Sequence, residues 1–135
     1  MLRLDPFTRG YINAALWNST DESLGESGPR PLAYRYSQRD LSRDTIAIMI
    51  YDCAEFQAAH AQYLGNDLEH AGVMLWITRN DIGPGYWSAD YDGAVAERLT
   101  LSALEMGEVH LFIDENNQVC SRRQPAANQS AKAVA

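Results

Sequence analysis

The sequence of 135 residues has few of the features that reveal a function directly. It contains one lysine and only two cysteines, Cys53 and Cys120, which are too far apart to form a CxxC pair. No apolar run approaches the roughly 18 residues that a membrane-spanning helix needs, and the first residues contain no apolar signal-peptide core. We therefore expect a protein of the reducing cytoplasm that has no membrane partner.

Catalytic and metal-binding motifs are missing as well. His60, His70 and His110 fall on different predicted elements and lack paired ligand spacing, so a zinc site is not expected. Residues 90–93 begin like a calcium loop but lack the spacing of an EF-hand and its terminal glutamate. Residues 80–85 contain no lysine for a phosphate loop, and no serine lies in a nucleophile elbow. We expect no cofactor, and the sequence favours a non-enzymatic protein.

Positive charge is scarce in the middle of the chain. Residues 44–115 contain 13 acidic side chains and two basic ones, Arg79 and Arg98, which gives this stretch −11 against −7 for the whole chain. An acidic body repels nucleic acid and attracts basic surfaces. We therefore expect no direct nucleic-acid binding by this region. The expected partner is a basic protein or a nucleoprotein complex, unless the acidity serves solubility alone.

Three segments carry signals typical of helices. Asp5 and Ser42 are N-cap residues in front of apolar side chains spaced three and four apart, and a similar series begins at Asp92 or Gly93. Glycine follows the second and the third of these series, where it would end a helix. The expected helices therefore cover residues 6–17, 43–64 and 93–106.

Two hairpins complete the predicted fold. The short apolar run Val73–Thr78 predicts a strand, which a glycine-rich turn joins to an extended segment at Tyr86 and Trp87. Residues 109–113 and 118–120 predict the second hairpin. The order α-α-β-β-α-β-β predicts the α+β class, with three helices packed on a small antiparallel sheet of two hairpins. We expect a single domain over 1–121, a mobile acidic loop at about 19–31 and a disordered tail over 122–135.

The most distinctive stretch runs from His70 to Trp87 and reads HAGVMLWITRNDIGPGYW. It resembles a segment, HAG-x3-W-[LI]-TRN-x2-G-x-G-[FY]-W, of a family of small uncharacterised phage and prophage proteins, and the likeness extends over about residues 7–120. The resemblance implies a phage or mobile-element origin, in the cytoplasm of an infected bacterium, but no activity. Val73 and Ile82 stand where the family has histidines, so a histidine-based site is not expected.

The same segment has a structural and a functional interpretation. In the first, Trp76 and Trp87 pair across a hairpin, while Arg79 holds the turn by bonding carbonyls or Asp81. In the second, these aromatic and arginine side chains are exposed and grip a partner, because Trp, Tyr and Arg dominate interface hot spots. The sequence leaves both interpretations open.

The expected function is that of a phage-encoded acidic binding protein. It would inhibit a host nucleic-acid-handling or defence complex, in the manner of an anti-CRISPR or anti-restriction protein, by imitating the charge of nucleic acid. The expected partner-binding residues are Asp44, Asp52, Glu55, Asp67, Glu69, Trp76, Arg79, Tyr86 and Trp87. One alternative is a small enzyme or ligand binder with a pocket at the glycine-rich turn, using His70 and Arg79. Another is a structural or replication accessory protein of the phage.

Overall fold

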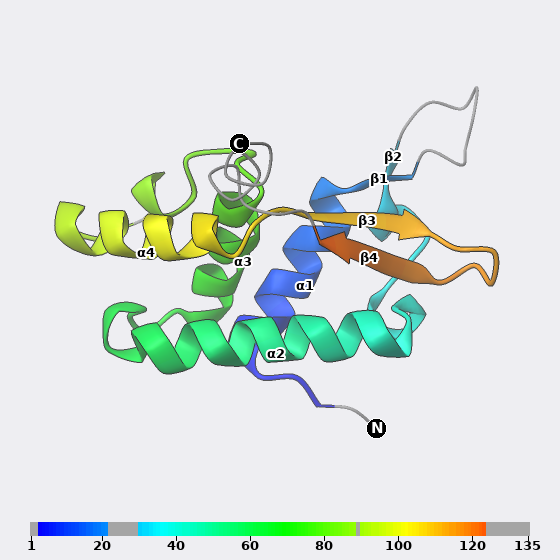
Figure 1. Cartoon of the computed structure of the whole chain (residues 1–135), viewed down its shortest axis with the longest axis horizontal. Helices are drawn as coiled ribbons and strands as arrows, with labels where there is room; N and C mark the ends of the chain where they lie inside the picture. The colour runs from blue at the N-terminus through cyan, green and yellow to red at the C-terminus, as the bar shows by residue number, and fades with distance from the viewer. Residues whose placement is uncertain (1–2, 22–29, 89, 124–135) are drawn as a thin grey trace, which may run out of the picture.

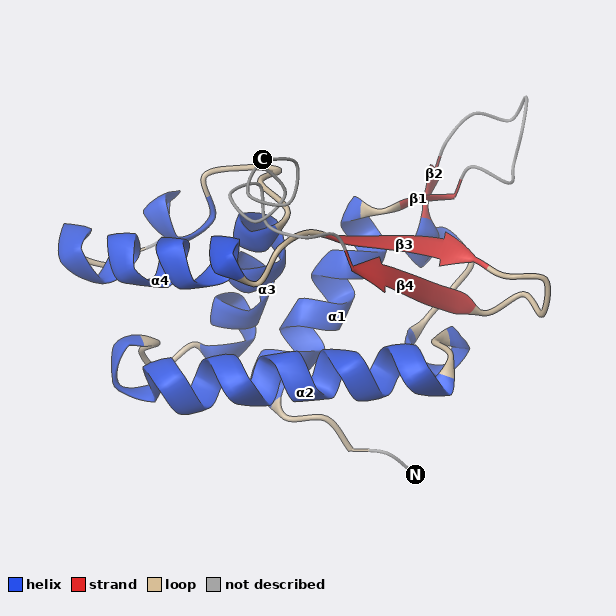
Figure 2. Cartoon of the chain, in the orientation of Figure 1, coloured by secondary structure: helices blue, strands red, loops and turns tan. Residues whose placement is uncertain are grey.

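The protein is α+β in the computed structural model, which describes residues 3–21, 30–88 and 90–123 (Figure 1, Figure 2). The helices are α1 (Pro6–Asn18), α2 (Arg43–His60), α3 (Leu68–Arg79) and α4 (Gly93–Glu105). The strands are β1 (Thr20–Asp21), β2 (Arg30–Pro31), β3 (Val109–Ile113) and β4 (Val119–Arg123), and 3-10 turns occur at η2 (Leu32–Tyr34), η3 (Gln38–Asp40), η4 (Ala61–Tyr63) and η5 (Gly85–Ser88). Strands β1 and β2 form one antiparallel ribbon, and β3 and β4 form a second. None of the helices in these ranges is long and apolar enough to cross a membrane.

Three of the helices are those that the sequence predicts. Asp5 caps α1, since its Oδ1 accepts a hydrogen bond of 2.8 Å from the Thr8 amide. Ser42 caps α2 in the same way, with 3.1 Å between its Oγ and the Thr45 amide, and Asp92 caps α4. The hairpin of β3 and β4 is confirmed too. Local capping chemistry therefore decided where the helices α1, α2 and α4 begin.

The first predicted hairpin is wrong, and with it the predicted element order. Val73–Thr78 lies inside α3, whose N-cap is Asp67, and Tyr86 and Trp87 belong to η5. Neighbouring elements cover α3 so completely that most of its middle residues are buried. A helix without a polar face shows the same short apolar run as a buried strand, so periodicity could not separate the two.

Helices α1 and α3 touch backbone to backbone at the centre of the fold. A Cβ atom on Gly10 would lie 2.0 Å from the Glu69 carbonyl oxygen, and one on Gly72 would lie 1.9 Å from that of Phe7. Both distances are far below any real contact of this kind. Glycine at these two positions therefore permits the close approach that places α3 in the core.

The hairpin of β3 and β4 is attached to the start of α2 through the β4 edge (Figure 1). The Ser42 amide donates to the Val119 carbonyl oxygen at 2.9 Å, and Leu41 forms an isolated parallel bridge to the same residue. Strand β4 extends to Arg123, so the predicted boundary between domain and tail at residue 122 is too early. Most of the expected acidic loop (22–29) and the rest of the expected tail (124–135) lie outside the described residues.

Candidate functional site

The structure separates the predicted partner-binding residues into two groups. The exposed ones are Asp44, Glu55, Asp67, Glu69 and Trp87. The buried ones are Asp52, Trp76, Arg79 and Tyr86. Asp52 is therefore not the surface carboxylate that its predicted partner-binding role requires, and of the aromatic and arginine patch in the functional interpretation of the segment His70–Trp87 only Trp87 is exposed. The other side chains serve the core.

Arg79 is the centre of a buried polar network. Its Nε donates to the Gly107 carbonyl oxygen at 2.8 Å and its Nη2 to that of Met106 at 2.9 Å. Its Nη1 donates to the Tyr11 hydroxyl at 3.1 Å and to Asp52 Oδ2 at 3.0 Å. The guanidinium thus stabilises the C-terminal end of α4, where a cation is favoured, and ties it to α1 and α2. It has no free side to offer a partner.

A second arginine shares the Asp52 carboxylate. Nη2 of Arg123 makes a short contact with the same Oδ2 atom, while the Arg123 side chain stays about half exposed. Burial raises the pKa of the neighbouring Tyr11 hydroxyl, which therefore stays protonated and accepts the hydrogen bond from Arg79. Two guanidinium groups neutralise Asp52, so this carboxylate adds nothing to a negative surface. Sequence reasoning missed the pair because it assigned Arg123 to the tail.

The outward side of α2 carries a stripe of four exposed residues, Asp44, Ile48, Tyr51 and Glu55, which we call the α2 stripe. Their spacing of four, three and four places them on one helix face. Ile48 is 45% exposed and Tyr51 is 63% exposed. A groove of about 470 Å³ lies beside the two apolar side chains, between α2 and the sheet, with Val109 among its lining residues. Sequence reasoning missed Ile48 and Tyr51, although they form a second apolar series on α2.

The other two exposed carboxylates among the predicted partner-binding residues, Asp67 and Glu69, lie at the start of another helix. Asp67 is engaged in capping α3, where its Oδ1 accepts from the His70 amide at 3.1 Å. Glu69 Oε2 lies 4.0 Å from Arg9 Nη2, in an exposed ion pair that contributes little to stability. Both belong to the start of α3, away from the α2 stripe along the chain. The predicted negative face is thus divided between two helices.

The pocket predicted from His70 and Arg79 does not form, because the two residues occupy opposite ends of α3. At a rise of about 1.5 Å per residue they are on the order of 13 Å apart along the helix axis. His70 instead lines a cavity of about 360 Å³ together with Asp67, Ser88 and Tyr91. Within the described ranges, no group of three or more histidine, cysteine or acidic side chains could hold a metal ion.

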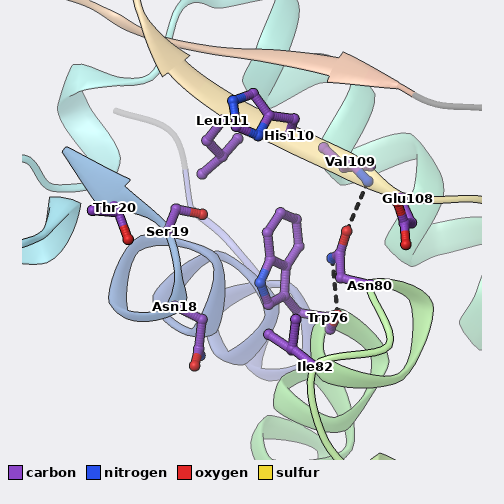
Figure 3. Close-up of a pocket in the computed structure, with 10 residues that line it drawn as sticks. All are labelled: Asn18, Ser19, Thr20, Trp76, Asn80, Ile82, Glu108, Val109, His110 and Leu111. Carbon is purple, nitrogen blue, oxygen red and sulfur yellow. Dashed lines mark hydrogen bonds between the residues drawn. The ribbon is translucent and has the colours of Figure 1, made fainter. Parts of the chain in front are cut away.

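A further cavity, of about 310 Å³, lies where α1, α3 and β3 meet (Figure 3). Asn80 braces it: its Oδ1 accepts from the Val109 amide at 2.8 Å, and its Nδ2 donates to the Trp76 carbonyl oxygen at 2.9 Å. Trp76 borders the cavity and packs edge to face on Tyr11, with 5.4 Å between ring centroids. The other lining residues are Asn18, Ser19, Thr20, Ile82, Glu108, His110 and Leu111.

Comparison of the chain with protein-family models, with curated proteins and with solved structures finds no match. The resemblance of the segment His70–Trp87 to phage proteins therefore stays an expectation from the sequence. The α2 stripe and the cavities are the features of the structure that bear on function.

Proposed function

We propose that the protein is a non-enzymatic binding module, which docks on a basic surface of another protein through the α2 stripe. The observation that carries this proposal is the arrangement of the stripe, in which Asp44 and Glu55 flank the exposed Ile48 and Tyr51 on one helix face. An apolar centre with charged ends has the composition of a protein interface, in which the core is depleted of charge and the rim is polar.

The two parts of the stripe contribute differently to binding. Full burial of a large apolar side chain contributes roughly 1.5–3 kcal/mol, of which Ile48 and Tyr51, each about half exposed, can gain a part on binding, and tyrosine is frequent among interface hot spots. The carboxylates of Asp44 and Glu55 select a basic partner and accelerate the encounter, as does the −11 balance of residues 44–115. The affinity for the partner should therefore weaken as the salt concentration rises.

In its specific form, the proposal names the kind of partner. A phage-encoded acidic protein in the bacterial cytoplasm would occupy the nucleic-acid-binding surface of a host complex, of the kind that anti-CRISPR and anti-restriction proteins block. Such surfaces are basic because they bind phosphate. The support for this form is the charge of the chain and the resemblance of its sequence to phage proteins.

Binding of a small ligand at His70 is a second candidate function. The cavity beside His70 offers an imidazole, the Asp67 carboxylate and the Ser88 hydroxyl in one concave place. Arg79 does not line this cavity, so the cavity lacks the cation that the sequence predicted beside His70. Chemical-shift changes at His70 on addition of small-metabolite mixtures would support this candidate, while the α2 stripe would be unaffected.

Affinity capture from host lysate tests the main proposal. The bait is the full chain as wild type, as the double variant Tyr51→Ala/Glu55→Arg, and as the control Glu97→Arg, which changes an exposed glutamate on α4 by the same charge. We expect the wild type and the control to retain one basic protein at about 0.05 M salt and to release it at about 0.5 M, because salt screens surface charges. The double variant should retain none of it. If the amount of protein retained were the same at both salt concentrations, and the same for the double variant as for the wild type, the proposal would be contradicted.

A further inference from the structure

The cavity beside Trp76 lies along the edge of β3. Glu108, Val109, His110 and Leu111 all line it, although they follow one another in the chain. Successive side chains of a strand point to opposite faces, so a cavity that four consecutive residues border runs along the edge of the strand. Figure 3 shows β3 passing over the cavity in this way.

Hydrogen bonds show that this is the edge of β3 that faces away from β4. The Ser121 amide donates to Thr45 Oγ1 in α2 at 3.0 Å, so the polar backbone groups of Ser121 face away from β3. Leu111 stands opposite Ser121, and in such a non-hydrogen-bonded pair its N–H and C=O groups face away from β4. Val109, two residues earlier, has the same orientation, and its amide donates to Asn80 Oδ1.

Three polar groups at the cavity, two on the Leu111 backbone and one on Trp76, have no hydrogen-bond partner among the described residues. Leu111 is 3% exposed, yet no described residue bonds to its outward N–H or C=O group. The Trp76 indole N–H, which lies beside the cavity in Figure 3, takes part in none of the described hydrogen bonds and is open to the cavity. A buried backbone donor or acceptor is stable only when it is paired, so Leu111 calls for a partner that both donates and accepts, and the Trp76 indole offers a further donor beside it.

The wall opposite β3 is a second stretch of extended backbone. Ser19 and Thr20 lead from the end of α1 into β1, whose other side pairs with β2. Asn18, next to them, donates its Nδ2 hydrogen to the Ala14 carbonyl oxygen at 2.8 Å. The cavity is thus a slot between the β1–β2 ribbon and the β3–β4 hairpin.

We propose that an extended segment of the partner protein enters this slot and adds as a strand to the free edge of β3. The backbone of such a segment supplies alternating N–H and C=O groups, which is what Leu111 lacks, and one carbonyl can accept from the Trp76 indole. The exposed carboxylate of Glu108 at the slot favours a basic side chain nearby. This inference rests on the proposed function, because it assigns a second contact to the same basic partner.

Nuclear magnetic resonance of the full chain tests the inference with a defined probe. The probe is a short capped peptide of alternating arginine and valine residues, compared with the same peptide methylated on every second backbone nitrogen. Methylation keeps the charge and the side chains but removes the donors that strand pairing needs. We expect the first peptide to shift the Leu111 amide and the Trp76 indole signals, to leave those of the exposed Trp17 and Trp87 unchanged, and to bind about ten-fold or more tightly than the methylated one.

A matched pair of variants locates the contact. Thr20→Trp fills the slot from an exposed position, and Gln62→Trp adds the same side chain at the exposed η4 turn. Only the first should abolish the shifts at Leu111 and Trp76. Equal binding of both peptides would overturn strand addition, as would shifts confined to the α2 stripe, and the second result would leave the proposed docking of the stripe intact. Should Thr20→Trp not fold, the comparison of the two peptides still decides.

Discussion

Arg79 and Asp52 form an ion pair inside the protein, with 3.0 Å between Nη1 and Oδ2 and with both side chains almost completely buried. The charges compensate each other, and three further donors of the guanidinium are used by two backbone carbonyls and by Tyr11. These additional hydrogen bonds make the burial of two charges tolerable. The network of the pair therefore ties the C-terminal ends of α3 and α4 to the middle of α1 and of α2, and it takes no part in the proposed interface.

The residues beside Arg79 have equally structural roles. Thr78 Oγ1 accepts from the Tyr86 amide at 3.2 Å, and Asn80 bridges α3 to β3. The tripeptide Thr78–Asn80 thus ties α3 to η5, to α4 and to the sheet. Of these three residues, the structural interpretation of the segment His70–Trp87 assigned a role to Arg79 alone, as a donor to carbonyls at a turn. Arg79 does bond two carbonyls, those of Met106 and Gly107, but from the end of a helix and not from a hairpin.

The two arginines that bind Asp52, Arg79 and Arg123, should contribute very differently to the free energy of unfolding. Arg79→Leu leaves a buried carboxylate without its internal partner and should lower the free energy of unfolding by about 3–5 kcal/mol. Arg123→Leu removes a half-exposed partner of the same carboxylate and should cost about 1 kcal/mol or less. Urea denaturation of the two variants measures both values. Similar losses in the two variants would show that the burial of the pair is not what stabilises it.

The contact between α1 and α3 predicts a sharp difference among glycines. Gly10→Ala and Gly72→Ala place a methyl group against a carbonyl oxygen, so each should lower the free energy of unfolding by about 1–3 kcal/mol or more. Gly93, in the first turn of α4, has no atom within 4 Å of the position that a Cβ would take. Gly93→Ala should therefore be neutral or stabilising by up to about 1 kcal/mol. Thermal unfolding of the three variants measures the order, and a loss at Gly93 as large as at Gly10 would contradict the close contact of the two helices.

His60 should make the stability of the fold depend on pH. Burial lowers the pKa of His60, and the Arg98 guanidinium lowers it further. Because its pKa is lower in the folded than in the unfolded state, its contribution is complete above the unfolded value of about 6.5 and is lost as the pH falls through the folded value. We expect the free energy of unfolding to decrease from about pH 7 to about pH 5, and His60→Gln to flatten this part of the curve. Urea denaturation at a series of pH values measures it, and His110→Gln, at an exposed histidine, is the control.

The two cysteines should differ in reactivity. Burial raises the pKa of the Cys53 thiol, and it also raises that of Cys120, which is only partly buried. Since the thiolate is the reacting form, both should react slowly with iodoacetamide at neutral pH, and Cys53 only when the protein unfolds. Mass spectrometry of the alkylated chain, with and without urea, measures the two rates. Rapid labelling of Cys53 in the absence of urea would show that the core opens at α2.

Local signals in the sequence predict much of the fold and little of the site. The caps at Asp5, Ser42 and Asp92 place three helices, because an N-cap acts within a few residues of itself. The α2 stripe could have been predicted only in part, since Asp44 and Glu55 attract attention by charge, whereas Ile48 and Tyr51 look like core residues. The slot beside β3 has no signal in the sequence, because its walls come from three stretches that are far apart in the chain, 18–20, 76–82 and 108–111.

The sequence by itself determined the α+β class, the caps, the second hairpin and the acidic balance, all of which depend on residue type and short-range spacing. Only the tertiary structure decided that Val73–Thr78 is helical, because that depends on which sides of the segment other elements cover. It also decided that Asp52 faces Arg79, a partner 27 positions away, and not solvent. Burial and long-range pairing depend on the whole chain folding at once, so no single segment of the sequence contains them.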